Sequence, residues 1–356
     1  MTSLDSLLQD ASSFVTSEFG FNIEQSKLKP YSLENWQEFC QTNNFDSNSS
    51  GIYVPASHSA YVRVDSPFLT SNIFHELYGH GLFVEHSQIG KRLTEIIQNR
   101  GDERGFMLNE VNPQDQMFSI AKHNIHNYEG FAVWLESLLC KETNNSKIWN
   151  AKKDGLREDY AQLFEFFEDA ESRLSRFGLI SQMGFPKHYD DEKVLDVVKK
   201  LYDSHFNNVD FVVLYGSQKP ESDIDLCVVS SNPSNQYFNG WLDIAELNRE
   251  DFQNRMNNLD IALTDAMFSG RLIFGDENTF HQYKQTILEK PISQEMIEYN
   301  QRKANLQKEY LYSYQDDDRM KKLCLSYIDS FSQNAEQLSL GIKPLTLKNI
   351  KEIYTK

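Results

Sequence analysis

The chain has 356 residues, of which 40% are hydrophobic and 13% aromatic, and its formal net charge at pH 7 is −17. This length exceeds what one hydrophobic core usually supports, and it favours two domains. Every apolar run is shorter than the roughly 20 residues of a membrane-spanning helix. No membrane partner is therefore expected. The acidic balance also argues against nucleic acid as a partner, because clustered Lys and Arg must neutralise its phosphates.

The N-terminus and the cysteines indicate the compartment. The opening "MTSLDSLLQDASSF" has no basic region followed by an apolar stretch, so no secretory signal is expected and the cytoplasm is the predicted location. The four cysteines are far apart and form no C-x-x-C pair, which favours reduced, buried thiols. They are Cys40, Cys140, Cys227 and Cys324.

The first half of the chain has the pattern of a strand followed by helices. Period-two alternation in "AYVRV", residues 60–64, predicts an edge strand. Helical patterns then begin near Asn72 and recur over residues 91–99, 127–142 and 158–178. The Gly-Pro-charged stretch "GFPKHYDDEK" at residues 184–193 is the predicted linker.

The second half has a different pattern. A helix over residues 194–206 precedes apolar runs typical of strands, and from about residue 278 the chain is again helical. The predicted strands lie at residues 210–216, 224–230 and 240–247. The sequence thus predicts the α+β class, with a mostly helical domain over 1–187, a small mixed-sheet domain over 188–290 and a helical segment over 291–356.

The segment "NIFHELYGHGLF", residues 72–83, begins like the helical zinc motif His-Glu-x-x-His but has its second histidine one residue late. At a spacing of five, a regular helix rotates His75 and His80 about 140° apart. Both can bind one metal only if the helix contains a bulge, which is most easily accommodated at Gly79. We therefore predict a bulged helix with His75 and His80 as zinc ligands and Glu76 as the base. The alternative is a pair of hydrogen-bonded core histidines.

A third ligand comes from "NYEGFAVWLES", where Glu129 and Glu136 interrupt an otherwise apolar helix. Carboxylates on an apolar helix are unfavourable to bury unless they are paired or bind a metal. Glu129 is the predicted third zinc ligand. Glu136 lies seven residues further on the same face, and it is either a residue that supports a ligand or a solvated residue.

Both segments resemble known zinc enzymes. "HELYGHG" resembles the His-Glu-x-x-Gly-His signature of dipeptidyl peptidase III, a metallopeptidase family in which the late histidine is normal. "EGFAVWLE" is similar to the Glu-Gly-x-Ala-x-x-x-Glu segment of gluzincin-type carboxypeptidases, whose first Glu binds zinc. The resemblance implies a zincin-like domain that hydrolyses peptides, with His75, His80 and Glu129 as zinc ligands and Glu76 as the base.

The segment "FVVLYGSQKPESDIDLCVV" predicts a hairpin with acidic residues at the start of its second strand. Asp223 and Asp225 are two apart in a strand, so both carboxylates face one side. Carboxylates this close repel each other unless a divalent cation lies between them, and Mg²⁺ prefers such oxygen ligands and bridges to phosphates. Gly216 and Ser217 offer a backbone that a triphosphate can approach and a hydroxyl that can bind it. The alternative is a polar turn between two buried strands.

This hairpin resembles the polymerase-β-type nucleotidyltransferases, whose hallmark is Gly-Ser, a turn and then Asp-x-Asp. The turn "QKPES" is shorter than is usual in the family and lacks its frequent Arg, for which Lys219 is the predicted substitute. The following "NQYFNGWLDIAELN" is similar to the next strand of the kanamycin-type and minimal members, which carries a third carboxylate. The resemblance implies transfer of a nucleoside monophosphate from a nucleoside triphosphate to an acceptor hydroxyl.

Two residues compete for the role of the third carboxylate. Asp243 lies in a β-patterned run after the Asp-x-Asp strand, and Asp260 opens a run with a helical pattern, "IALTDAMFSGRLIFGD". Asp243 is preferred, as a metal ligand or as the base that takes the acceptor proton. The acceptor itself is not readable from the sequence.

The sequence therefore predicts a fusion of two enzymes, a zinc-dependent peptidase-like hydrolase and a Mg²⁺-dependent nucleotidyltransferase. One alternative makes the nucleotidyltransferase the sole enzyme and the first half a binding module stabilised by a metal. A second alternative is an interaction protein without catalytic activity. Metal content and nucleotide-dependent labelling separate the three.

Overall fold

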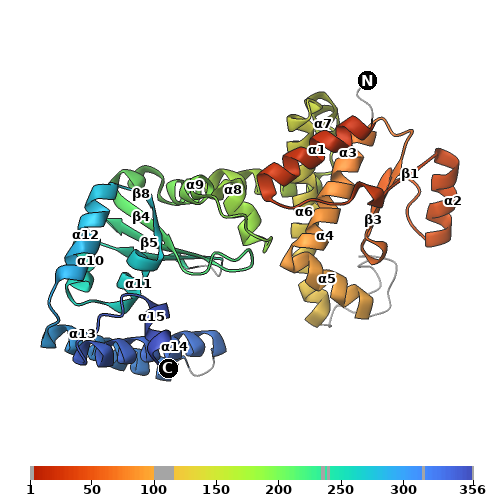
Figure 1. Cartoon of the computed structure of the whole chain (residues 1–356). Helices are drawn as coiled ribbons and strands as arrows, with labels where there is room; N and C mark the ends of the chain where they lie inside the picture. The colour runs from red at the N-terminus through yellow and green to blue at the C-terminus, as the bar shows by residue number, and fades with distance from the viewer. Residues whose placement is uncertain (1–3, 100–115, 234–236, 239–240, 315–316, 355–356) are drawn as a thin grey trace. The chain divides into compact units, whose positions relative to one another are not determined.

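The computed structural model describes residues 4–99, 116–233, 237–238, 241–314 and 317–354 (Figure 1). The chain divides into two units, Met1–Leu201 and Tyr202–Lys356, and each has its own hydrophobic core. Helices and two small mixed sheets build these units, so the predicted α+β class is confirmed. Among the described helices, none is both long and apolar enough to cross a bilayer.

The first unit is mostly helical. Its elements are α1 (Leu4–Phe19), η1 (Gln25–Lys27), β1 (Leu28–Tyr31), α2 (Leu33–Asn43), β2 (Gly51–Val54), η2 (Pro55–Ser57), β3 (Ser59–Arg63), α3 (Leu69–Ile73), η3 (Phe74–His80), α4 (Gly81–His86), α5 (Gln88–Asn99), α6 (Gln116–Glu142), α7 (Ser146–Lys153), α8 (Glu158–Gln182) and α9 (Asp191–Tyr202), which ends at the boundary.

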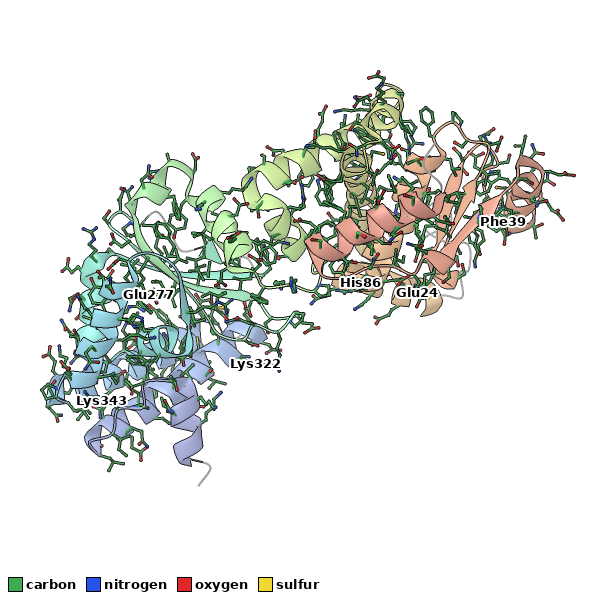
Figure 2. The ribbon with its side chains drawn as sticks, turned by 45° about the horizontal axis from the view of Figure 1, so that its top comes forward. Glu24, Phe39, His86, Glu277, Lys322 and Lys343 are labelled. Atoms are coloured by element: carbon green, nitrogen blue, oxygen red, sulfur yellow. The ribbon has the colours of Figure 1, made fainter. Side chains whose placement is uncertain are left out.

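The small sheet of the first unit has the strand order β1-β3-β2. Strand β3 pairs in parallel with β1 and antiparallel with β2, so it is the central strand, and the prediction of an edge strand at residues 60–64 is wrong. Sequence alternation identifies a strand but not its neighbours. Helix α2 covers part of this sheet through Phe39, whose ring stacks on that of Tyr61 with centroids 4.5 Å apart (Figure 2).

The core of the first unit forms around α6. Phe131, Trp134 and Leu135 of this helix are all buried, and η3 packs against it with Leu77. Gly130 allows a second close contact, because a Cβ there would lie 2.3 Å from a ring carbon of Phe167 in α8. Burying these large side chains between helices stabilises the scaffold that carries the HE motif.

The predicted linker at residues 184–193 belongs to the first unit, so that interpretation is corrected. Phe185 is 1% exposed and stacks on Phe21 with ring centroids 5.2 Å apart. In the helix that follows, the ammonium group of Lys193 donates a hydrogen bond to the backbone oxygen of Glu18 at 2.7 Å. The boundary therefore lies at 201/202, in the last turn of α9, and not at the expected 187/188.

The second unit is built on a five-stranded sheet. Its elements are η5 (Asp203–Asn208), β4 (Val209–Tyr215), β5 (Ile224–Ser230), β6 (Tyr237–Phe238), β7 (Leu242–Leu247), α10 (Arg249–Asn257), α11 (Ile261–Ser269), β8 (Arg271–Phe274), α12 (Glu277–Glu289), α13 (Gln294–Ser313), α14 (Asp318–Ser339) and α15 (Leu347–Tyr354).

The sheet of the second unit has the order β6-β7-β5-β4-β8. Strands β4 and β5 form an antiparallel hairpin, and β7 returns parallel to β5. The run predicted to be helical after Asp260 divides into α11 and β8 at Gly270, where a Cβ would lie 2.4 Å from the backbone oxygen of Ala266. The helical segment predicted at residues 291–356 belongs to this unit, where α13 and α14 pack side by side (Figure 1).

Candidate functional site

The HE motif lies on a wide helical turn. Between α3 and α4 the chain forms η3, a π-helix over Phe74–His80, in which the turn contains more residues than in an α-helix. The rings of His75 and His80 consequently come together, with centroids 4.7 Å apart and planes at 87°. The predicted bulge near Gly79 is therefore confirmed.

Gly79 is required by the packing of this turn. A Cβ at position 79 would lie 2.7 Å from the Cα of Ala132 in α6, a distance that real Cβ atoms essentially never show. The backbone of η3 thus approaches the backbone of α6 directly. Because Glu129 is one helical turn before Ala132, this contact holds the two histidines beside that carboxylate.

His75, His80 and Glu129 form a compact group. Nε2 of His75 lies 3.7 Å from Oε2 of Glu129, and Nε2 of His80 lies 3.5 Å from the same oxygen. All three ligand atoms lie within 4.8 Å of one another, and within the described ranges this is the only such group of three metal-binding side chains. The sequence-predicted ligands are therefore brought together by the fold.

Glu136 contacts His75 at the ring nitrogen that does not face Glu129. Its side chain is 0% exposed, and its Oε2 lies 3.0 Å from Nδ1 of His75. Its Oε1 accepts hydrogen bonds from Nζ of Lys152, at 2.6 Å, and from the hydroxyl of Ser71. Glu136 is thus not solvated, which excludes one of the two roles left open by the sequence, and it contacts His75. With Nδ1 facing Glu136, Nε2 of His75 faces Glu129.

The two histidines of this group differ in charge. Burial lowers the pKa of His75, but its bonds to Glu129 and Glu136 outweigh burial and raise the pKa to about 10. Burial lowers the pKa of His80 to about 3. The proton on His75 thus lies between the half-buried carboxylate of Glu129 and the buried one of Glu136, which Lys152 also contacts at 2.6 Å. A divalent cation fits this donor set, since two imidazoles and a carboxylate are the usual ligands of catalytic zinc.

Glu76 lies at the junction of two cavities. Burial raises the pKa of its carboxyl to about 7. Its side chain lies under β2, where a Cβ on Gly51 would come within 2.8 Å of its Cγ. Cavities of about 420 Å³ and about 320 Å³ both reach His75 and Glu76, so the carboxylate faces space in which a substrate can bind. This is the position expected for the base.

Two tyrosines complete the surroundings of the group. The hydroxyl of Tyr160 in α8 donates a hydrogen bond to Oε2 of Glu129 at 3.1 Å. The ring of Tyr128 stacks on the imidazole of His80, with centroids 3.9 Å apart. These contacts fix the orientation of both side chains.

In the second unit the Gly-Ser turn lies against the acidic strand. Gly216 follows β4 with a φ of 71°, a conformation that favours glycine. A Cβ at this position would lie 2.0 Å from Oδ2 of Asp225, so only glycine allows the approach. The hydroxyls of Ser217 and Ser222 are 3.0 Å apart and close the turn. The close backbone approach predicted for Gly216 is therefore present.

Asp225 and Asp243 are direct neighbours across two parallel strands. The register of β5 and β7 pairs Asp225 with Asp243 and Ile224 with Leu242. Burial raises the pKa of Asp225, and with the charges of Asp223 and Asp243 the pKa reaches about 7. The two other predicted acids are therefore close enough to act on Asp225. Their ligand atoms are not as close together as those of the histidine group.

The competing candidate, Asp260, has a structural role. Its side chain is 0% exposed and caps α11 by accepting hydrogen bonds from the backbone N–H groups of Ala262 and Leu263, at 3.1 and 3.3 Å. The hydroxyl of Tyr299 donates a third, at 3.0 Å. These three bonds occupy the carboxylate. Of the two candidates, Asp243 is the one that lies beside Asp225 in the sheet.

A cavity of about 490 Å³ opens beside Asp243. It lies between β7 and the helices α13 and α14, and its wall contains Lys303, Tyr310 and Tyr327. Both apolar and charged groups line it, which suits a small molecule larger than a metal ion.

Sequence reasoning missed several polar residues at both sites. Lys152 and Tyr160 lie in helices far along the chain, and no local pattern marks them. At the Gly-Ser turn, Arg271 of β8 donates a hydrogen bond to the side chain of Gln218, whereas Lys219 is exposed. An arginine of the neighbouring strand therefore contacts this turn. Only the register of β4 with β8, which pairs Leu214 with Arg271, brings it there.

No protein-family model matches the sequence, and no curated protein sequence is significantly similar to it.

Proposed function

We propose that the first unit is a zinc-dependent hydrolase that cleaves peptide bonds. The observation that carries this proposal is the π-helix of η3, which brings His75 and His80 to within ligand distance of Glu129. A π-turn is rare and concentrates at functional sites. Here it has a clear consequence, because a regular helix would direct His80 away from His75.

The chain's own residues account for the steps of such a reaction. Bound zinc supplies Lewis-acid polarisation of a carbonyl and makes a water easier to deprotonate. Glu76, buried and facing both cavities, takes the proton from the attacking water and returns it to the leaving amine. Glu136 holds Nδ1 of His75, so that Nε2 stays directed at the ion. Tyr160 holds Glu129 in place.

Strand β2 favours a peptide as the substrate. In the described part of the first unit this strand pairs only with β3, so its outer edge is available for an extended chain. Ser50 and Gly51 line the larger cavity, and Gly51 to Val54 line the smaller one. An extended peptide lying along β2 would pass over Glu76.

The test is metal content followed by hydrolysis. We expect about one zinc per chain by mass spectrometry of the purified protein, lost in His80→Ala, and cleavage of a mixed peptide library that Glu76→Gln abolishes while keeping the metal. Stoichiometric zinc without hydrolysis would favour the binding-module alternative. Absence of zinc from the native protein, together with no uptake of added zinc, would overturn the proposal.

We further propose that the second unit transfers a nucleoside monophosphate to an acceptor hydroxyl. The register that pairs Asp225 with Asp243, with Gly216 lying against the carboxylate of Asp225, supports this activity. Asp223 and Asp225 would hold Mg²⁺, which aligns the phosphates of the nucleotide. Arg271 and Ser217 bind phosphate oxygens, and Asp243 takes the proton of the acceptor.

The matching experiment uses nucleotides with an α-phosphate label. Each of ATP, CTP, GTP and UTP is incubated with the protein and Mg²⁺, and label is sought on the protein and on supplied hydroxyl and aminoglycoside acceptors. Asp225→Asn and Asp243→Asn should abolish transfer. The control Asp210→Asn removes a carboxylate of the same unit that pairs with Arg249 at the other end of β4, and it should keep activity. No nucleotide-dependent thermal shift in the native protein would argue for a unit without catalytic activity.

A further inference from the structure

The cavity beside Asp243 lies on one face of the sheet of the second unit. Alternate residues of a strand point to opposite sides, so Asp243, Ala245 and Leu247 of β7 share a face. Leu247 packs in the core with Phe252 of α10, so this face is the one that helices cover. All three β7 residues line the cavity of about 490 Å³, which therefore extends along the strand from Asp243.

Two cations line the same cavity. Arg255 comes from α10 and Lys303 from α13, and both side chains are half-buried. Burial lowers the pKa of Lys303, and the charge of Arg255 lowers it further, so the two cations are close enough to repel each other. Like charges in a half-buried wall are unfavourable unless an anion lies near both.

The acids nearest to these cations have other partners. The charges of Asp260 and Asp251 act on Lys303 and raise its pKa. Asp260 caps α11, and Asp251 accepts a hydrogen bond from Nδ2 of Asn248 at 2.9 Å. Within the described part of the chain, the guanidinium of Arg255 takes part in no hydrogen bond or ion pair. Its donors are thus available to a ligand in the cavity.

The second acid of the cavity wall, Glu246, is directed to the other face of the sheet. It alternates along β7 with the residues that face the cavity. Its charge acts on Tyr202 instead, since burial raises the pKa of that hydroxyl and Glu246 raises it further. Asp243 is therefore the acid of the described wall that shares its face with the two cations.

The cations lie further along the sheet than the acids. Burial raises the pKa of the Cys227 thiol and the charge of Arg255 lowers it, so Arg255 lies near this residue. The register pairs Cys227 with Ala245, two residues after the pair of Asp225 and Asp243. Two residues of a strand span about 7 Å. A ligand that binds Arg255 through an anionic group can thus place a hydroxyl about 7 Å away, beside Asp243.

Aromatic rings separate the two ends of the cavity. Burial raises the pKa of Tyr327, the charge of Asp243 raises it further, and the charge of Arg255 lowers it, so this tyrosine lies near both ends. Tyr310 and Phe331 line the cavity with it. The body of a ligand between its hydroxyl and its anionic group therefore meets rings, which suits an apolar or aromatic compound.

We propose that Arg255 and Lys303 bind an anionic group, a carboxylate or a phosphate, of the hydroxyl compound that accepts the nucleotide. The proposal rests on the nucleotidyl transfer proposed above and names the chemical class of its acceptor. Arg255 and Lys303 act as specificity residues, and a cationic acceptor such as an aminoglycoside would meet two like charges.

The reaction with such an acceptor balances without a further reactant. The acceptor oxygen forms a bond to the α-phosphorus of the nucleoside triphosphate, and the bond from that phosphorus to the β-phosphate oxygen breaks. Pyrophosphate leaves, and the hydroxyl proton passes to Asp243.

Four 4-hydroxybenzyl compounds test the proposal by binding to the full chain. They share a phenol ring and carry a carboxylate, a phosphonate, a carboxamide or an ammonium group at the benzyl carbon. Calorimetry should give a Kd for one of the two anions roughly 10-fold or more below that of the carboxamide, the scale of a charge-assisted hydrogen bond. The tighter anion identifies the natural group. Equal Kd values for the anions and the carboxamide would overturn the proposal.

Variants assign the preference to the two cations. Arg255→Gln and Lys303→Gln should each reduce it, and Arg255→Glu should reverse it in favour of the ammonium probe, which a structural role would not do. Arg255→Lys keeps the charge and should keep most of the preference, even if Arg255→Gln lowers stability. Arg249→Gln is the matched control, because Arg249 lies in the same helix, pairs with Asp210 and does not line the cavity. Preference that survives loss of both cations would contradict the proposal.

The phosphates of the nucleotide are the alternative ligand of these cations. The α,β-methylene analogues of the four nucleoside triphosphates, added with Mg²⁺, should leave the Kd of the anionic probe unchanged. Displacement of the probe would assign Arg255 and Lys303 to the nucleotide and overturn the proposal. Anion-selective binding without transfer of labelled nucleotide to any acceptor would keep this site and remove the transferase. Transfer without anion preference would do the reverse.

Discussion

His75 and His80 are five residues apart in the chain, yet their rings lie 4.7 Å apart at nearly a right angle, on the same side of the helix. This relationship depends on one residue between them. Gly79 lets the backbone of η3 pack onto Ala132 of α6, and the π-turn is built at that contact. The metal-binding group is therefore a property of how two helices pack and not of one motif alone.

Gly79→Ala should destabilise the first unit by about 1–3 kcal/mol, because the added methyl overpacks the contact with α6. Zinc binding should be lost with it. Thermal unfolding and metal content are the measurements. Gly155→Ala is the control, since its new Cβ would meet only a backbone oxygen at 3.7 Å, an ordinary contact. If Gly79→Ala keeps both stability and zinc, the glycine is not what permits the π-turn.

Glu136→Gln should lower zinc affinity about 10- to 100-fold without removing a ligand, because it weakens the hold on Nδ1 of His75 and leaves Lys152 without its carboxylate. Competition with a chromogenic chelator measures the change. Lys152→Met should shift affinity in the same direction. The control Glu142→Gln changes an exposed acid of the same helix and should have no effect. Unchanged affinity in Glu136→Gln would show that Glu136 does not orient the ligand.

Asp225→Asn should stabilise the second unit at pH 8 in the absence of divalent cations. The folded-state pKa of Asp225 is about 7, above its unfolded value, so the folded state binds the proton more tightly. Stability from this group is present at low pH and is lost as the pH rises through about 7. Asn does not ionise, so the Asp225→Asn variant does not lose this stability at high pH. We expect the variant to be more stable than the native protein by about 1–2 kcal/mol at pH 8, and the difference to disappear near pH 4. Urea unfolding at both pH values measures it. A variant less stable than the native protein at pH 8 would contradict the prediction, and Mg²⁺ should stabilise only the native protein.

Substitutions of Asp243 and Asp260 should have different effects, one on activity and the other on stability. Asp260→Ala removes the cap of α11 and the acceptor of the Tyr299 hydroxyl, and it should cost about 2 kcal/mol or more. Asp243→Asn should leave the unfolding temperature close to that of the native protein and abolish nucleotidyl transfer. Denaturation and labelling with the active nucleotide test the pair. Transfer that survives in Asp243→Asn would show that another group takes the acceptor proton.

Local patterns were sufficient to predict most elements and the ligand group. Apart from the run after Asp260, which contains β8 as well as α11, the predicted helices and strands occur in the described chain, because hydrophobic periodicity reflects which face each element buries. The bulge at Gly79 followed from counting residues between His75 and His80. Asp225 and Asp243 were predictable because each begins a strand pattern.

Long-range packing set the limit of what the sequence could predict. The linker at residues 184–193 looked polar and flexible, yet Phe185 within it stacks in the core. Lys152, Tyr160 and Arg271 reach the two sites from elements whose neighbours are set by the whole fold. No spacing in the sequence marks such residues, since each is an ordinary surface residue type on its own element.

The short length of β2 limits the residence time of a peptide that binds along it. The strand has four residues, and in an antiparallel ladder only about every second residue turns its N–H and C=O to a given side. An extended peptide would therefore gain few backbone hydrogen bonds, each of which adds about 1 kcal/mol. On the proposed function, residence time on such an edge would be short, and side-chain contacts in the two cavities beside Glu76 would decide which peptides remain long enough to be cleaved. We expect rapid exchange of short peptides and little turnover of chains held in folded proteins.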